Sequence, residues 1–406
     1  MRGITKLSSL AVLAFMTTLV FSMPMSAGDT DKDWTVLLYN DGDNNLESYA
    51  LTSVSQLAMI GSDDNVNLVA LTDTLSDVAY LQYVEKNNLV NIPGYGYPKE
   101  VDMSSGATLE EFIEIGVSNY PAAHYAVILW DHGGGWRGIC WDDTSYELTG
   151  VDDFISMAEL RSAFWGASNA TGEYIDVVGF DACLMAMPEV AYQMRGLADY
   201  LVFSEETISA YSFPYDMIAA DLEANPEVGA QGCAAMICED YAQFYASLTG
   251  FVDWTISAFH TENMAALTDA VKYFGSELLG SLSLYINAYQ RDQIQADRYY
   301  YPYNVDLMGF ANNILADSSI KDEGVKDSAR EVVMAVDACV ESVFNGMHDV
   351  DSTGLAIYFP STHGGMHDMK EEYAEIPFAV DTGWYVFCEE FSDFNGRTWV
   401  AEKLSY

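Results

Sequence analysis

A histidine and a cysteine, two side chains used in nucleophilic catalysis, each stand directly after an apolar run of strand length. His132 follows "YAVILWD" and Cys183 follows "IDVVGFDA". A cysteine reacts as its thiolate, and a histidine beside it takes up the thiol proton and later delivers it to the leaving group. Because the carboxyl ends of neighbouring parallel strands meet at one edge of a sheet, we expect the two side chains to lie close together. The pattern therefore predicts covalent catalysis by a Cys-His pair.

The glycines after His132 fit the same chemistry. Gly133 and Gly134 have no side chain, so a substrate backbone is able to approach them closely. We expect the backbone amides of Gly133 and Cys183 to bind the oxyanion of a tetrahedral intermediate. A single histidine or cysteine in a core is usually a packing residue. Here the pairing of two strand ends, one of them on a glycine turn, favours catalysis.

The elements that position these residues alternate between short β-rich segments and amphipathic stretches, beginning at Trp34. The segments "WTVLLYN", "VNLVALTDT", "YAVILWDH" and "IDVVGFDA" are typical of strands, whereas "NNLESYALTSVSQLAMIG" and "SMAELRSAFWGAS" are typical of helices. Alternation of this kind indicates an α/β protein with a mostly parallel sheet and helices on both faces.

The chain divides into three regions by composition and pattern. Residues 1–27 have a basic start, a compact apolar run and a small residue for cleavage, which predicts a signal peptide. The α/β core is expected over 28–258. Residues 259–406 contain long helical patterns, including 324–346, and predict a helical C-terminal region. The strand-like run at 354–360 is a candidate to return to the main sheet, so we expect one compact core with the helical region attached.

Charge and cysteine content restrict the class of protein. The 406 residues include 17 basic and 61 acidic side chains, for a net charge of −44, which argues against nucleic acid as a partner. No segment after the signal is apolar enough to span a membrane, so we expect a secreted or extracytoplasmic protein. Of the six cysteines, Cys183 must stay free if it reacts. A chain of this size folds without disulfides, and we expect few or none.

The residues around the histidine and the cysteine resemble those of the clostripain family, within the caspase, legumain and gingipain clan of cysteine peptidases. The similar stretches are "WTVLLYNDGDNNLE", "AVILWDHGGGW", "GFDACLMAMPEVAYQM", "LVFSEE", "VDLMGF" and "GLAIYFP", in the order of the family and over nearly the whole mature chain. The resemblance implies a caspase-like three-layer α/β/α sandwich. It also implies a cysteine endopeptidase that acts on protein or peptide substrates.

Roles for single residues follow from this resemblance. It makes Cys183 the nucleophile, His132 the general base and acid, and the amides of Gly133 and Cys183 the oxyanion donors. Asp181 matches the acid that binds a Lys or Arg side chain before the scissile bond. The alternative for Asp181 is an acid that caps the neighbouring turn.

Two features of the sequence depart from the family. In "AYSFPY", Tyr211 stands where many relatives have a second acid, so we expect an aromatic wall and a moderate preference for Arg over Lys. Relatives are activated by cleavage after a basic residue between the histidine and the cysteine. Residues 138–160 contain no Lys or Arg, so we expect an enzyme that works as one uncleaved chain.

The remaining candidates are weaker. No cofactor is required for the chemistry, but the resemblance to clostripain, which depends on calcium, makes Ca²⁺ a candidate, with Asp41 and Asp43 as the proposed ligands. The tyrosine run "RYYYPY" at 298–303 is interpreted as packing rather than as a ligand platform. The main rival hypothesis is a catalytically inactive binding or cell-surface protein that keeps the fold; it is favoured by "AYSFPY" and by the missing cleavage site.

Overall fold

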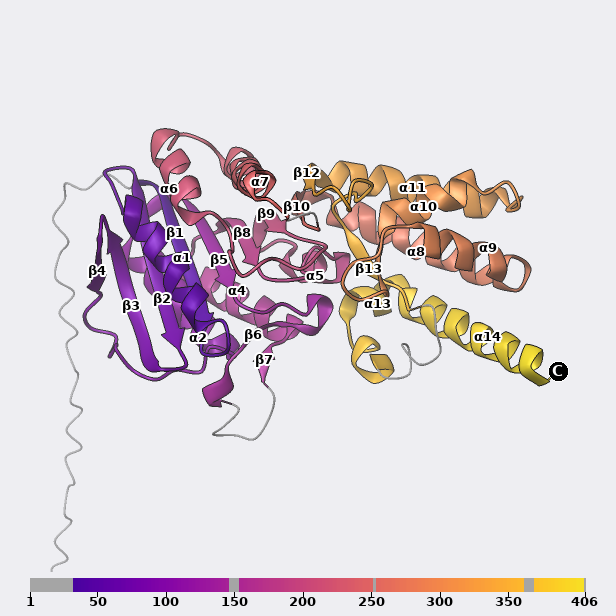
Figure 1. The fold of residues 1–406 in the computed structure, drawn as a ribbon, viewed down its shortest axis with the longest axis horizontal. Coiled ribbons are helices and arrows are strands. Elements are labelled where there is room, and N and C mark those ends of the chain that lie inside the picture. The colour runs from indigo at the N-terminus through magenta and orange to yellow at the C-terminus, as the bar shows by residue number, and fades with distance from the viewer. Residues whose placement is uncertain (1–31, 146–152, 251–252, 361–368, 405–406) are drawn as a thin grey trace, which may run out of the picture. The chain divides into compact units, whose positions relative to one another are not determined.

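A nine-stranded sheet forms the centre of the computed structural model, which describes residues 32–145, 153–250, 253–360 and 369–404. Its strands are β1 (Lys32–Gly42), β2 (Val66–Thr74), β3 (Asp77–Glu85), β4 (Asn88–Asn91), β5 (Ala122–Trp130), β8 (Ile175–Asp181), β9 (Ala198–Phe203), β10 (Thr255–His260) and β12 (Val340–Asn345). They lie in the order β12-β10-β9-β8-β5-β1-β2-β3-β4 (Figure 1). The five strands β9, β8, β5, β1 and β2 are parallel to one another. At the two edges, each further strand pairs antiparallel with its neighbour: β10 with β9, β12 with β10, β3 with β2 and β4 with β3.

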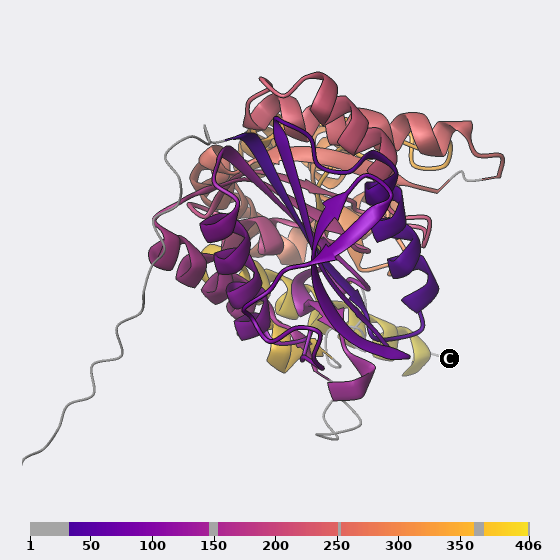
Figure 2. The same ribbon diagram turned by 90° about the vertical axis from the view of Figure 1, so that its left-hand side faces the viewer.

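Helices cover both faces of this sheet (Figure 2). One face is covered by α1 (Glu47–Ile60), α6 (Tyr215–Ala224) and α7 (Ala230–Ser247). The other face packs against α2 (Gly106–Asn119), α4 (Met157–Thr171) and α5 (Pro188–Met194). Successive side chains of a strand point to opposite faces, and β1 accordingly sends Val36 and Leu38 into the first core and Leu37 and Tyr39 into the second. The predicted α/β architecture is confirmed.

The C-terminal region consists mainly of helices, as expected. They are η2 (Thr261–Asn263), α8 (Met264–Gly280), α9 (Leu282–Gln295), α10 (Leu307–Ala316), α11 (Glu323–Cys339), α13 (Pro377–Thr382) and α14 (Trp384–Leu404). Figure 1 shows α8, α9, α10 and α11 beside one another. Their buried side chains belong to the same core as α2, α4 and α5. The described residues from Lys32 onward therefore form one compact unit.

The structure corrects the expected helix over 324–346. Helix α11 ends at Cys339, and Val340–Asn345 form β12, which pairs antiparallel with β10. Exposure alternates along this segment between partly buried and exposed side chains, which is the period of a strand at a sheet edge. The boundary expected after residue 258 therefore falls inside β10, and the C-terminal region contributes a strand to the main sheet.

The strand expected at 354–360 exists but does not return to the main sheet. It is β13 (Ala356–Tyr358), which pairs antiparallel with β11 (Asn304–Asp306) in a separate two-stranded sheet. The edge of the main sheet beside β10 is already occupied by β12. β13 instead accompanies the segment after Cys183, because the Ala356 amide donates to the Ala186 carbonyl at 2.9 Å.

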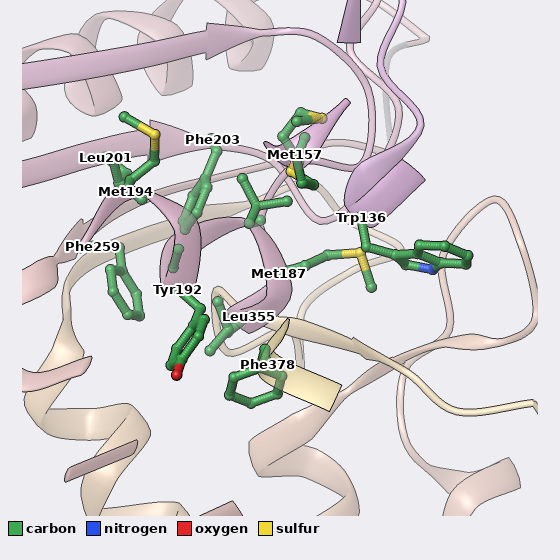
Figure 3. Packing of buried hydrophobic residues seen from close by; sticks show 14 of the residues in the cluster. Trp136, Met157, Met187, Tyr192, Met194, Leu201, Phe203, Phe259, Leu355 and Phe378 are labelled. Atoms are coloured by element: carbon green, nitrogen blue, oxygen red, sulfur yellow. The ribbon is translucent and has the colours of Figure 1, made fainter. Parts of the chain in front are cut away.

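Buried apolar side chains join this C-terminal region to the loops at the strand ends. Trp136, on η1 (Gly135–Arg137) just after the histidine, lies beside Met187 from the segment after the cysteine (Figure 3). Leu355 and Phe378 of the C-terminal region belong to the same cluster. Both loops therefore rest on one continuous core.

The structure also shows the state of the cysteines and whether a helix is able to span a membrane. All six cysteines are free, and five of them are buried. Among the described residues, no helix combines the length and the apolar character needed to cross a membrane. The expected signal peptide, 1–27, lies outside the described residues.

Candidate active site

His132 and Cys183 lie at neighbouring strand ends. β5 and β8 are adjacent and parallel, and their register places Trp130 opposite Asp181. His132 and Cys183 each follow two residues later on their own strand, so the sequence leads both to the same edge of the sheet. They also line one cavity of about 140 Å³.

The turn after each strand is tightly fixed. A Cβ atom on Gly133 would lie 2.3 Å from the Cys183 carbonyl oxygen and 2.8 Å from its amide nitrogen, so only glycine fits between the two turns. Leu184 directly follows the cysteine with a φ of 66°, a left-handed conformation that is uncommon for leucine. The sharp turn directs the chain away from the sheet edge immediately after Cys183.

The Gly133 amide lies outside the backbone ladder of the histidine loop. Gly133 forms a bridge with Ile139 of β6 (Ile139–Trp141), which pairs with β7 (Phe154–Ile155). The bonds of that bridge are donated by the amides of Gly134 and Cys140, at 2.9 and 3.3 Å. The Gly133 amide is therefore placed beside the Cys183 turn without a partner in that bridge.

The Cys183 thiol is partly buried and protonated at neutral pH. Its Sγ atom donates to the Ile208 carbonyl oxygen at 3.7 Å. Burial, aided by the nearby carboxyl groups of Asp181 and Glu206, raises the pKa of Cys183 to about 11. A thiolate at this site therefore requires a base to take the proton.

The imidazole of His132 is neutral and oriented by Asn45. Burial lowers the pKa of His132, although the charge of Asp143 opposes this effect. The Asn45 side-chain oxygen lies 3.0 Å from Nε2, and an amide oxygen only accepts, so Nε2 carries the proton. The lone pair is then on Nδ1, where it is available to accept a proton.

A second asparagine fixes the loop itself. Asn44 donates from Nδ2 to Asp131 Oδ1 at 2.7 Å and to the Trp141 carbonyl at 2.9 Å, and the Trp141 amide donates to Asp131 Oδ2 at 2.6 Å. The sequence prediction did not include Asn44 or Asn45. The only signal for them was their place in the stretch "NDGDNNLE" at the end of the first strand.

We expect Asn45→Ala to lower kcat for peptide hydrolysis about three- to tenfold, with little change in KM, because one hydrogen bond that orients the imidazole contributes about 1 kcal/mol. Steady-state kinetics on a peptide substrate measures this. Asn88→Ala, which removes an exposed asparagine whose side chain donates to Glu85, is the matched control. An equal effect of the two variants would contradict a role of Asn45 in orienting His132.

Asp181 lines the cavity that contains Cys183. Its side chain is 3% exposed, and Oδ2 accepts from the Phe213 amide at 3.0 Å and from the Tyr215 hydroxyl at 2.7 Å. Oδ1 is buried without a hydrogen-bond partner. Burial raises the pKa of Asp181 to about 7, although hydrogen bonds from the Phe213 amide and from the Tyr215 and Ser212 side chains oppose this. The carboxyl group thus caps a turn through Oδ2, and Asp181 is one of the residues that line the cavity.

Sequence and structure comparisons agree with this arrangement. A sequence profile of the clostripain family matches residues 38–391, which is most of the chain. The chain belongs to the clostripain family. Clostripain from Hathewaya histolytica is 31% identical over 227 residues. That match covers 47% of this chain and 42% of clostripain, so the chain spans less than half the length of this relative.

Two solved structures have a similar fold. One is a secreted C11 cysteine protease from Bacteroides thetaiotaomicron in complex with an irreversible peptide inhibitor, with a TM-score of 0.66 and 21% identity over 87% of this chain and 99% of that one. The other is an inactive zymogen C11 protease from Parabacteroides distasonis, with a TM-score of 0.64 and 23% identity over 87% and 99%. The predicted caspase-like α/β/α fold is confirmed.

The segment that departs from the clostripain family, "AYSFPY", does not supply the expected aromatic wall. Tyr211 is 55% exposed, and the cavity beside Asp181 is lined at this point by Ser209, Ala210 and Ser212. Ser212 has a φ of 66°, a sharp turn that accompanies the placement of Tyr211 on the surface. The prediction that Tyr211 borders the pocket is therefore not supported by the geometry.

Among the described residues, an acidic cluster lies where β1 and β2 end. Carboxylate oxygens of Asp43, Asp73 and Glu100 all lie within 4.8 Å of one another. Asp43 and Asp73 are buried, and each has an Oδ2 atom without a hydrogen-bond partner. Asp41, the other predicted ligand, is outside this group, and its Oδ1 accepts from the Asp43 amide at 3.2 Å. Burial raises the pKa of Asp73 to about 8, helped by the charge of Glu100.

Proposed function

We propose that this clostripain-family protein is an exported cysteine endopeptidase that hydrolyses peptide bonds through Cys183 and His132. The observation that carries the proposal is the register of β5 and β8, which leads a cysteine and a histidine to adjacent strand ends beside a buried acid. Export rests on the sequence of residues 1–27 and agrees with the secreted relative from Bacteroides thetaiotaomicron.

The chemistry starts from a neutral pair. As Cys183 Sγ attacks the carbonyl carbon, His132 takes the thiol proton, and the carbonyl oxygen becomes an oxyanion. The C–N bond then breaks, His132 gives its proton to the leaving amine, and a thioester remains on Cys183. Water attacks the thioester, His132 takes the water proton, and release of the acid product returns a proton to the thiol. No step needs a cofactor.

The oxyanion is proposed to accept hydrogen bonds from the amides of Gly133 and Cys183. The backbone at Gly133 lies so close to that of Cys183 that a Cβ on Gly133 would be 2.8 Å from Cys183 N. At this separation the two amides are proposed to donate to one acceptor. Donors that are fixed before the reaction stabilise the developing charge without further reorganisation.

The cavity beside Asp181 is proposed to bind the side chain before the scissile bond, with a preference for Arg and a weaker one for Lys. The carboxylate of Asp181 provides one charge-assisted hydrogen bond, worth about 1.5–3 kcal/mol. A guanidinium has five donors in a plane, whereas an ammonium is a compact point charge. Ser209 and Ser212 line the same cavity, and their hydroxyl oxygens are acceptors for the donors that a guanidinium has in excess of an ammonium. The cavity is therefore proposed to favour Arg.

A peptidyl alkylating agent with Arg at its reactive end tests the proposed function. It is expected to modify Cys183 far faster than Cys339 or Cys388, which are buried. Mass spectrometry of the labelled protein identifies the modified thiol. Modification of Cys183 no faster than of the buried thiols would favour the rival hypothesis, a binding protein that keeps the fold without catalysis.

We expect the active enzyme to consist of one uncleaved chain after signal removal, because residues 138–160 contain no basic residue. Denaturing electrophoresis of active protein, with mass measurement, checks this. Part of the interval, 146–152, lies outside the described residues. Two associated fragments cut between residues 138 and 160 in active protein would show the prediction to be wrong.

Calcium is proposed to bind the Asp43, Asp73 and Glu100 cluster. Ca²⁺ prefers carboxylate oxygens, and three such oxygens within 4.8 Å of one another fit a single ion. The two buried oxygens without partners are a further reason, because a buried carboxylate is costly unless it is paired or coordinates a metal. The ion is proposed to stabilise the fold at the end of β1.

We expect millimolar calcium to raise the unfolding temperature by about 5 °C, because a ligand that binds only the folded state stabilises it. Asp73→Asn should abolish the shift, whereas Asp41→Asn, at the buried acid outside the cluster, should keep it. The shift should grow as pH rises through about 8, where Asp73 loses its proton, because the charged form is the ligand. Equal shifts in both variants would contradict this site.

A further inference from the structure

A second cavity shares His132 with the cavity that contains Cys183. Its volume is about 410 Å³, within the range of small-ligand pockets, and it is lined by His132, Gly133, Gly134, Trp136, Arg137, Trp141, Tyr301, Tyr303, Asn304 and Met369. His132 lines both this cavity, called here the tyrosine cavity, and the one that contains Cys183 and Asp181. Cys183 lines only the latter.

We propose that the tyrosine cavity binds an aromatic side chain of the substrate on the leaving-group side of the scissile bond, at the first or second position after it. The proposal rests on the proposed function. His132 must lie within hydrogen-bond distance of the amine that leaves, so the chain after the scissile bond begins at His132. The side chain before that bond occupies the cavity of Asp181, and the tyrosine cavity is the adjoining space.

The walls of this cavity suit a flat apolar side chain. The rings of Tyr301 and Tyr303 are stacked, with centroids 5.1 Å apart and planes inclined by 7°. Tyr301 is 40% exposed, so part of its ring remains accessible to a ligand. Trp141 closes the histidine side, with its ring 3.1 Å from the place of a Cβ on Gly134. Aromatic groups stack with about 0.5–1.5 kcal/mol beyond the burial of their area.

The described walls of this cavity offer no counter-charge to a basic side chain. Arg137 lines the cavity, and its Nε atom lies 3.1 Å from Glu372 Oε2 on the exposed side. Among the described residues, the lining includes no carboxylate that would attract Lys or Arg, whereas Asp181 lines the other cavity. The two cavities therefore select different side chains on the two sides of one bond.

The tyrosine cavity exists only because the C-terminal region docks on the histidine loop. Trp136 packs edge-on against Tyr358 and Tyr373, with ring centroids 5.2 and 5.0 Å apart. This contact holds Tyr301 and Tyr303, far along the chain, opposite the glycines after His132. The tyrosine run interpreted from sequence as packing thus forms part of a wall.

Peptides with Arg before the scissile bond and either Phe or Ala at the two positions after it test the proposal. The reference peptide has Ala at both positions after the scissile bond, and the test peptides have Phe at one of them. We expect kcat/KM to be about tenfold higher for the better Phe peptide than for the Ala–Ala peptide, by analogy with the discrimination of apolar pockets. Tyr301→Ala should bring this ratio close to one. The matched control is Tyr300→Ala, at a 66% exposed neighbour that does not line the cavity, which should leave both the ratio and the activity unchanged.

The outcomes separate the two proposals. Cleavage of the Ala–Ala peptide with a Phe/Ala ratio near one in the wild type would overturn the aromatic subsite and leave the peptidase intact. A ratio that survives Tyr301→Ala, or one that Tyr300→Ala lowers equally, would also overturn it. Absence of any cleavage, together with slow alkylation of Cys183, would overturn both.

Discussion

Replacing Cys183 with alanine is expected to lower kcat/KM for an Arg-containing peptide by at least about ten-thousandfold, because no other group at the site forms the acyl intermediate. His132→Ala should cost a similar factor. The double variant should be no worse than either single one, since the pair acts as a unit. The free energy of unfolding should change by no more than about 1 kcal/mol, because the thiol is only partly buried.

The matched control is Cys339→Ala, a buried thiol in helix α11. It should reduce the stability of the fold and leave kcat/KM unchanged. Kinetics and thermal unfolding on the same preparations separate the two effects. Residual activity of Cys183→Ala within tenfold of the wild type would contradict the proposed nucleophile.

The rate of alkylation of Cys183 should depend on pH, because only the thiolate reacts. The pKa of Cys183 is raised to about 11, so in the free protein the thiolate fraction is small at pH 7 and rises about tenfold per pH unit up to that pKa. Alkylation by a small neutral reagent should follow this rise. Alkylation by the peptidyl reagent should already be fast at pH 7, because it is bound beside His132.

Asp181→Asn is expected to lower kcat/KM for Arg substrates about 10- to 100-fold and to affect substrates with apolar residues much less. The loss corresponds to one charge-assisted hydrogen bond of about 1.5–3 kcal/mol. Profiling a peptide library with all residues before the scissile bond measures it. Asp176→Asn, at the other end of β8 where the carboxylate contacts His124, is the matched control.

The preference for Arg should also depend on pH in the wild type. Burial raises the pKa of Asp181 to about 7, so the carboxyl group of the free enzyme is neutral below that pH and charged above it. Affinity for Arg should therefore rise as pH increases through about 7, and the asparagine variant should lack this rise. An unchanged residue profile in Asp181→Asn would mean that Asp181 only caps the turn at Phe213.

The sequence alone was sufficient to predict the parallel strands and the two residues at their ends. Runs such as "YAVILWD" and "IDVVGFDA" are apolar throughout, which is the pattern of strands buried on both faces, and this pattern is local. The neighbouring positions of His132 and Cys183 follow once the strands are parallel and adjacent. The turn residues also carry a local signal, because Gly133 is required where two backbones approach closely.

Only the tertiary structure decided which distant segments meet at the site. The edge of the main sheet goes to Val340–Asn345, which continue a helical sequence pattern, and not to the strand at 356–358, whose sequence is strand-like. Which segment pairs with this edge depends on the tertiary arrangement and not on local preference. Asn45, Asp73 and Glu100 reach their partners through strand order, and a sequence pattern does not contain that order.

Tyr211 and Tyr301 show that the sequence does not determine which tyrosine side chain lines a cavity. Both are tyrosines in proline-containing stretches, and the sequence predicts Tyr211 as a wall of the substrate pocket and the run at 298–303 as packing. One lies outside the cavity beside Asp181, and the other lines the cavity beside His132. Side-chain direction after a turn depends on long-range packing, here of Trp136 on Tyr358, which arises only when the whole chain has folded.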